Sequence, residues 1–201
     1  MTAITQVGII NMALGHLKQR PITAITDLSV QAQVANIYYE PSRREALRGN
    51  SWSFATCVNT LSLLSNYTPT TNWAYAYSYP SNAVAIWRVY DDSSADKSSD
   101  GDFRVLYDSV NNQKVIVSNS VDAYAEYTYD LSDTSLFDAN FVTAFAYRLA
   151  AAMAPQLTGD DNIAKEMIVL FNNAVSEAQR ISSYENKAVE TAITSSYEDA
   201  R

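Results

Sequence analysis

The spacing of the apolar residues changes twice along this chain of 201 residues. Apolar residues recur three or four positions apart, as on a helix, through residues 5–18 and 29–48, and again through 138–157 and 160–184. Between residues 52 and 130 the pattern is that of strands separated by turns. Strands set between helices predict an α+β fold, in which a frame of about four helices carries a small inserted antiparallel β-domain.

These changes divide the chain into two domains and a tail. We expect residues 1–52 and 135–184 to form one discontinuous helical domain, with residues 53–134 as the inserted β-domain. From 185 to 201 the apolar stripe is lost and the sequence becomes polar. Because such a segment buries little apolar surface, it predicts an extended or flexible C-terminal tail that orders only on assembly.

Capping residues mark the helix boundaries. Asp27 or Ser29 precedes the second helix, Asp138 precedes the third, and Gly159 ends the third. Pro41 is expected to kink or restart the second helix. The side chains expected to face inward from that helix are Val34, Ile37, Tyr38 and Leu47.

Five β-prone segments lie in the middle of the chain, and the pair Asn111 and Asn112 predicts a tight hairpin between two of them. The five segments are residues 73–80, 83–90, 103–107, 114–118 and 123–129. In the first segment every second residue is aromatic, so Trp73, Tyr75, Tyr77 and Tyr79 are expected on one face of a strand. Packing in a β-core is the favoured interpretation, and a stacking surface for carbohydrate, single-stranded nucleic acid or protein is the alternative.

The charge of the chain limits its partners. A net charge of −8 is unsuited to a protein that neutralises nucleic-acid phosphates. Arg43, Arg44 and Arg48 form the one dense basic cluster, which we expect beside acidic neighbours or a partner chain. The 14 tyrosines suggest a contact surface. No apolar run reaches the roughly 18 residues of a membrane helix, and the N-terminus does not resemble a signal peptide, so we expect a protein without a membrane partner.

The residues of enzyme centres are sparse. His16 is the only histidine and Cys57 the only cysteine, and neither lies in a metal-ligand or nucleophile motif. Glycine-rich phosphate loops and the nucleophile-elbow motif are absent from the sequence. We therefore predict no catalytic, cofactor-binding or metal-binding residues.

Two acidic groups permit alternatives to that prediction. Residues 91–102 fit a calcium loop poorly, since Tyr107 would stand where a bidentate glutamate is needed, and a solvated hairpin loop is favoured. A general acid and base for glycoside hydrolysis are conceivable among four carboxylates whose spacing the sequence does not establish: Asp122, Glu126, Asp130 and Asp133.

Four ordered segments of the chain resemble the tail tubular protein A family, the head-to-tail adaptors of short-tailed bacteriophages. Together they span roughly residues 5 to 180, and their agreement in order is more specific than any one of them. The segments are residues 11–17 followed by 21–22 and Asp27, Tyr39 with 43–47 and 50–55, residues 73–80, and residues 138–141 leading into 149–154. The C-terminal tail and residues 91–102 match no pattern of that family.

The resemblance implies a virion protein that forms a ring, of twelve copies, between the portal protein and the tail nozzle protein. DNA would pass through its central channel without specific binding. The resemblance carries over no catalytic residues. A neck or tail-completion protein, assembled as a hexamer, is an alternative, and a polysaccharide hydrolase of the tail is a further one.

Candidate contact residues are basic or aromatic. We expect the helical frame to dock against neighbouring copies and the portal, and the β-domain to project toward the tail. The residues predicted at partner interfaces are Arg43, Arg44, Trp73, Tyr75, Tyr77, Tyr79, Tyr184 and Tyr197.

Overall fold

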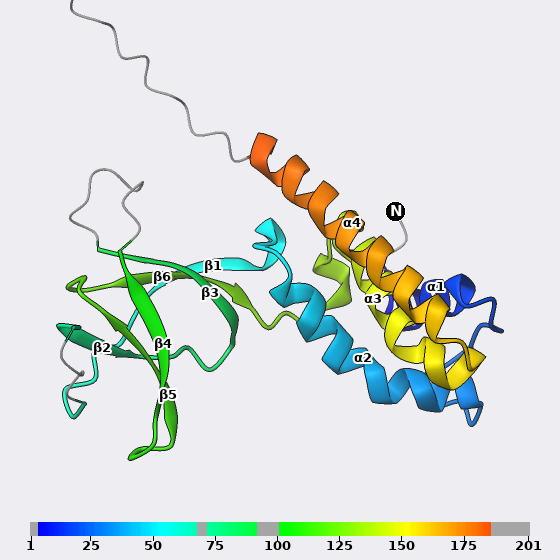
Figure 1. Ribbon diagram of the computed structural model, residues 1–201, viewed down its shortest axis with the longest axis horizontal. Helices are drawn as coiled ribbons and strands as arrows, with labels where there is room; N and C mark the ends of the chain where they lie inside the picture. The colour runs from blue at the N-terminus through cyan, green and yellow to red at the C-terminus, as the bar shows by residue number, and fades with distance from the viewer. Residues whose placement is uncertain (1–3, 68–71, 92–100, 186–201) are drawn as a thin grey trace, which may run out of the picture.

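The helices and the strands occupy two neighbouring bodies (Figure 1). The computed structural model describes residues 4–67, 72–91 and 101–185, with side chains as far as residue 181. Within these residues it contains four α-helices and six strands, and the chain enters the strands after the second helix and leaves them before the third. The predicted α+β class, a helical frame with an inserted antiparallel β-domain, is confirmed.

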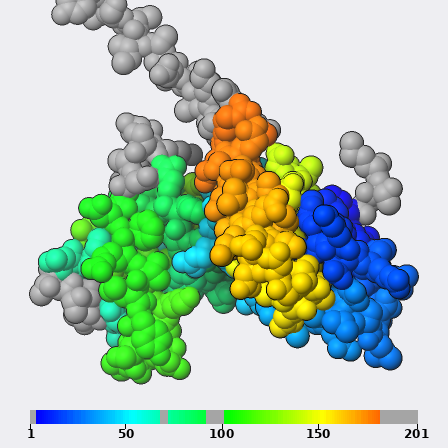
Figure 2. All heavy atoms as spheres, turned by 45° about the vertical axis from the view of Figure 1, so that its right-hand side comes forward, coloured from blue at the N-terminus to red at the C-terminus, as the bar shows by residue number. Residues whose placement is uncertain are grey.

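The helical frame is built around α3. It consists of α1 (Gln6–His16), α2 (Val30–Arg48), α3 (Ala139–Thr158) and α4 (Asp161–Glu185). Phe141, Phe145 and Leu149 of α3 are fully buried. The end of α4 extends beyond the other helices, and the space-filling view shows α4 on the surface of the molecule (Figures 1 and 2).

Local hydrogen bonds begin and end these helices. Ser29 Oγ accepts from the backbone N–H of Ala32, so Ser29 rather than Asp27 caps α2, and Asp138 caps α3 as predicted. Asp27 instead accepts from the backbone N–H groups of Thr23 and Ala24. Gly159 ends α3 with φ of 67°, the left-handed conformation that a C-terminal glycine supplies without steric cost.

Helix α2 departs from the sequence prediction at two residues. It continues through Pro41, so it does not restart there. Ile37 is 60% exposed, and Tyr39 is buried against Phe145, with 5.0 Å between ring centroids. The helix tolerates Pro41 because the carbonyl that it leaves without an N–H partner belongs to Ile37, on a face that water reaches.

Six strands form two three-stranded antiparallel sheets. The first sheet has the order β1-β6-β3 and the second β2-β5-β4. The strands are β1 (Thr56–Thr60), β2 (Tyr75–Ser78), β3 (Ala83–Tyr90), β4 (Phe103–Asp108), β5 (Gln113–Ser118) and β6 (Tyr124–Tyr129). The sequence pattern predicted five of them and missed β1.

Short 3₁₀ turns lie where the chain crosses between the two bodies. Ser53–Ala55 precedes β1, and Thr134–Leu136 follows β6 and precedes α3. Around the first crossing, Trp52 and Phe54 pack on Phe141, with ring centroids 5.1 Å apart in each pair. The crossings are therefore anchored in the core of the helical frame.

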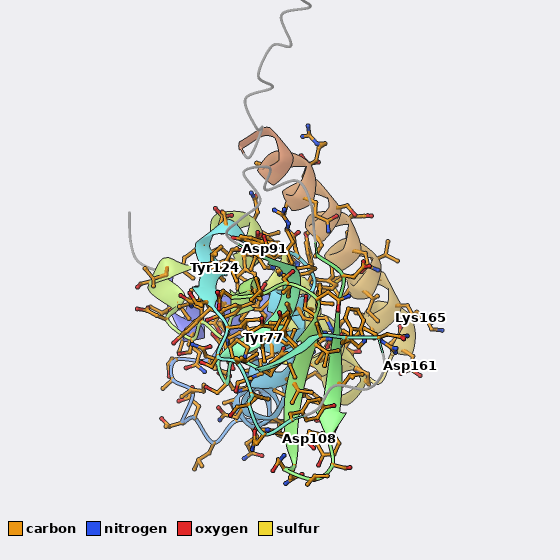
Figure 3. The ribbon with its side chains drawn as sticks, turned by 90° about the vertical axis from the view of Figure 1, so that its left-hand side faces the viewer. Tyr77, Asp91, Asp108, Tyr124, Asp161 and Lys165 are labelled. Atoms are coloured by element: carbon orange, nitrogen blue, oxygen red, sulfur yellow. The ribbon has the colours of Figure 1, made fainter. Side chains whose placement is uncertain are left out.

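The predicted hairpin joins β4 to β5, with a four-residue turn over residues 109–112. Asp108 holds this turn, since one of its carboxylate oxygens accepts from the backbone N–H groups of Val110 and Asn111. The other accepts from the side-chain amide of Asn111 at 2.7 Å. In a side view Asp108 lies at the far end of the hairpin (Figure 3).

Some predictions concern residues that the structure does not describe. Residues 92–100, which contain most of the acidic segment tested as a calcium loop, lie outside the described residues, as do residues 186–201 of the predicted tail. Among the described helices, none combines the length and apolar character needed to cross a membrane.

Candidate interaction site at the junction of the helical frame and the β-domain

Arg43 of α2 is buried where the two bodies meet. Its Nη1 donates to the carbonyl oxygen of Leu131 at 2.6 Å and its Nη2 to Oδ1 of Asp130 at 2.7 Å, just beyond the end of β6. Nε and Nη2 also donate to Glu40 Oε2, one turn earlier on α2, at 3.1 and 2.8 Å. Every nitrogen of the guanidinium thus has a partner within the subunit.

Arg43 is therefore not a surface contact residue. Its side chain is 3% exposed, so the prediction that it lies at a partner interface is wrong. The prediction of acidic neighbours is confirmed by Glu40 and Asp130. Burial acts to lower the pKa of Arg43, but its hydrogen bonds to these two carboxylates outweigh that effect and raise the pKa.

The other two arginines of the cluster are exposed beside Arg43. The side chain of Arg44 is 62% exposed, and its Nη2 lies 2.9 Å from Oδ2 of Asp130. Arg48 donates from Nη1 to the carbonyl oxygen of Val84 in β3 at 3.1 Å. Asp130 therefore accepts from Arg43 with one oxygen and from Arg44 with the other.

A groove of about 410 Å³ opens between α2 and the β-domain. We call this the junction groove, and its lining residues are Arg44, Glu45, Arg48, Ser81, Ala83, Val84, Lys114 and Asp130. The ammonium group of Lys114 lies 5.2 Å from the centre of the Tyr79 ring. Burial raises the pKa of Tyr79, and the positive charge of Arg48 opposes that shift.

The aromatic segment is divided between two clusters of the β-domain. Tyr77 is 1% exposed and donates to the carbonyl oxygen of Ser120 at 2.6 Å, and Tyr75 and Tyr79 pack around the same cluster. Trp73 packs with Ala76 on the opposite face of β2. The core interpretation of Tyr77 is confirmed, and the prediction of all four rings on one face is wrong for Trp73, which precedes the strand.

Burial also removes Tyr77 from the predicted contact surface, because its side chain is enclosed within the subunit. Trp73, Tyr75 and Tyr79 are partly buried and keep some accessible surface. Tyr184 lies in the last turn of α4, where side chains are not described, and Tyr197 lies outside the described residues. The contact roles of these last two residues stay predictions.

Three of the four carboxylates considered for hydrolysis have structural partners. Glu126 lies 3.7 Å from Arg88, Asp130 binds the arginines of α2, and Asp133 accepts from the backbone N–H of Ser135. Asp122 stands in the turn before β6 with φ of 49°.

His16 packs against Tyr147, with 4.6 Å between ring centroids, and burial lowers its pKa. Within residues 4–67, 72–91 and 101–185, no group of three or more histidine, cysteine, aspartate and glutamate side chains has the geometry to hold a metal ion.

The sequence does not predict the roles of two residues of this site. It offers Asp130 as a possible catalytic carboxylate, whereas in the fold Asp130 binds Arg43 and Arg44. Lys114 is predicted only as part of a strand, whereas in the fold it lines the groove. The spacing of Glu40 and Arg43, three residues apart on a helix, was a signal that Arg43 has an acidic neighbour.

Four helices and two small antiparallel sheets define an α+β protein whose two bodies meet at a charged junction. No protein-family model matches the chain, and no curated protein sequence is significantly similar to it. The resemblance to phage adaptors therefore depends on the residues of the four segments alone, and its functional implications are proposals.

Proposed function

We propose that this chain is the head-to-tail adaptor of a short-tailed bacteriophage. Twelve copies form a ring between the portal protein and the tail nozzle protein, and the ring surrounds the channel through which DNA leaves the head. The protein is a structural component of the virion tail and has no catalytic role.

The observation that carries this proposal is the position of the resembling residues in the fold. Asn11 accepts from the backbone N–H of Ile22 at 2.8 Å and donates to its carbonyl oxygen at 3.0 Å, so it fixes the connection between α1 and α2. Trp52 donates from its indole nitrogen to the carbonyl oxygen of Ala46 at 3.0 Å. Arg43 ties α2 to the end of β6.

Asn11 comes from the first segment of the resemblance, and Arg43 and Trp52 come from the second. Each of the three side chains connects two parts of the structure. Agreement at such joints is stronger support for a shared fold than agreement at surface positions, because each joint constrains the path of the backbone. A fold shared with the adaptor family supports the adaptor role that the resemblance implies.

The charge of the protein is compatible with a DNA channel. A chain with a net charge of −8 repels phosphates over most of its surface, which favours sliding of the duplex over binding. The division into two bodies also suits a subunit that meets one partner above and another below. In this arrangement the helical frame contacts neighbouring copies and the portal, and the β-domain points toward the nozzle.

The test is the mass of the complex that forms when the purified chain is mixed with the portal protein of the same phage genome. Native mass spectrometry is expected to find twelve copies of the chain on one portal ring. Six copies would favour the alternative of a neck or tail-completion protein, and failure to bind the portal would overturn the proposal.

A further inference from the structure

The junction groove carries an excess of positive charge on an otherwise acidic protein. Its two carboxylates are already paired, Asp130 with Arg43 and Arg44, and Glu45 with Arg148 at 2.5 Å. Arg48 and Lys114 line the same groove, and their contacts within the described residues are a backbone carbonyl and an aromatic ring. Neither cation has a carboxylate partner among the described residues.

An acidic surface lies at the other end of the helical frame. Asp160 and Asp161 are exposed where α3 turns into α4, and Glu166 is exposed one turn later beside Lys165. We call this the acidic corner, and it consists of Asp160, Asp161 and Glu166. It lies at the end of the frame away from the β-domain (Figure 1, yellow), and Asp161 and Lys165 are at the periphery of the molecule (Figure 3).

We propose that the acidic corner of one copy docks into the junction groove of the next copy. This inference rests on the proposed function, since it specifies the contact that builds the ring. The two surfaces are complementary in charge, because the groove holds two cations without a carboxylate partner among the described residues and the corner holds three exposed carboxylates.

The positions of the two surfaces make the contact directional. Groove and corner lie on different parts of the subunit, so the same pairing repeats from copy to copy in a head-to-tail manner. Contacts of this heterologous kind close into rings when the rotation between copies divides the circle. Pairing also covers Arg48 and Lys114, which keeps two cations away from DNA in the channel.

Zero-length carbodiimide cross-linking tests the contact directly, because it joins a lysine ammonium to a carboxylate that touches it. In an equal mixture of ¹⁵N-labelled and unlabelled chain, cross-linked peptides between Lys114 and Asp160 or Asp161 are expected. Pairs in which one peptide is labelled and the other is not show that the link joins two copies. The variant Lys114→Arg keeps the charge and removes this link. Intermolecular cross-links that never include Lys114, or their complete absence at high protein concentration, would overturn the inference.

Charge variants give an independent readout. Sedimentation of Arg48→Glu/Lys114→Glu is expected to show self-association weakened by about tenfold or more, because two attractive pairs become repulsive. Asp160→Asn/Asp161→Asn should also weaken self-association, while residue 160 keeps a side chain that can cap α4. The matched control is Arg104→Glu on β4, an exposed arginine outside the groove, which should associate like the wild type.

A charge swap completes the test. The chain with both Arg48→Glu/Lys114→Glu and Asp160→Lys/Asp161→Lys should associate again, since each pair has reversed its sign on both sides. If the swap variant is folded but does not recover association, the proposed contact is wrong. The contact is also wrong if the groove variant associates normally but no longer binds to duplex DNA, because the groove would then bind nucleic acid.

The two proposals fail differently. If twelve copies assemble on the portal and the groove variants assemble equally well, the adaptor role stands and the groove contact is wrong. If the chain binds no portal, the adaptor role is wrong whatever the cross-links show.

Discussion

The guanidinium of Arg43 lies 2.7 Å from Asp130 Oδ1, and this contact joins the second helix of the frame to the end of the last strand. Arg43 also donates to the carbonyl oxygen of Leu131 and to Glu40. This buried side chain thus connects the helical frame to the inserted β-domain.

Arg43→Met is expected to lower the free energy of unfolding by about 3 kcal/mol, because its removal leaves Oδ1 of the half-buried Asp130 and the carbonyl oxygen of Leu131 without their donor. Urea denaturation measures the loss. The matched control is Arg44→Met, whose side chain is 62% exposed and pairs with the same carboxylate. It should cost at most about 1 kcal/mol. Equal losses in the two variants would show that burial of Arg43 does not matter.

Two glycines with open space around the position of an added Cβ are expected to respond in opposite directions to alanine. Gly159 has φ of 67°, so Gly159→Ala should lower the free energy of unfolding by about 1 kcal/mol. Gly15 lies in the last turn of α1, so Gly15→Ala should raise it by about 0.5 kcal/mol. Thermal unfolding of both variants checks the signs, and a stabilising Gly159→Ala would contradict the left-handed cap.

Tyr77 is expected to behave as a core residue. Tyr77→Ala should cost about 3–5 kcal/mol, since a fully buried ring leaves a cavity. Tyr77→Phe keeps the ring and loses the hydrogen bond to the carbonyl oxygen of Ser120, for a cost of about 1 kcal/mol. Urea denaturation separates the two effects. A Tyr77→Ala variant as stable as the wild type would favour the stacking-surface interpretation.

The turn between β4 and β5 is expected to loosen in acid. Hydrogen bonds from the side chain of Asn111, and then from the backbone, lower the pKa of Asp108 from its ordinary value of 3.8. A carboxyl whose pKa is lowered by folding contributes stability above its ordinary pKa, and that contribution is lost as pH falls through the lowered value. Hydrogen exchange of the Val110 and Asn111 amides should therefore accelerate relative to the rest of the hairpin below about pH 3.8.

Asp108→Asn is the control for this prediction. It cannot become charged, so its turn should exchange faster at neutral pH and show little further change in acid. Turn amides whose protection in the wild type does not depend on pH would contradict the role of the carboxylate.

Much of the fold follows from the period of the apolar residues. Strand β3 has the bounds that the sequence predicts, Ala83–Tyr90, because a long β-prone run ends at clear turns on both sides. Strand β1 was missed because its five residues are mostly polar and exposed. It is a strand by virtue of its pairing with β6, a long-range contact that local sequence does not record.

The sequence predicts less of the candidate site than of the fold. It shows the basic cluster of α2 but not the different roles of its three arginines. Arg43 is buried, Arg44 pairs with the same carboxylate of Asp130 as Arg43, and Arg48 lines the groove. Asp130, which binds Arg43 and Arg44, and Lys114, which lines the same groove, lie more than sixty residues later in the chain. Only the folded topology brings these residues together.

The central claim is that twelve copies of this chain form the ring between portal and nozzle, and cryo-electron microscopy of whole particles tests it most directly. The account predicts a twelve-fold ring of density directly below the portal, into which the helical frame and the β-domain of this chain fit. Density for the chain at another place in the particle, or a ring at that level built from a different protein, would contradict it.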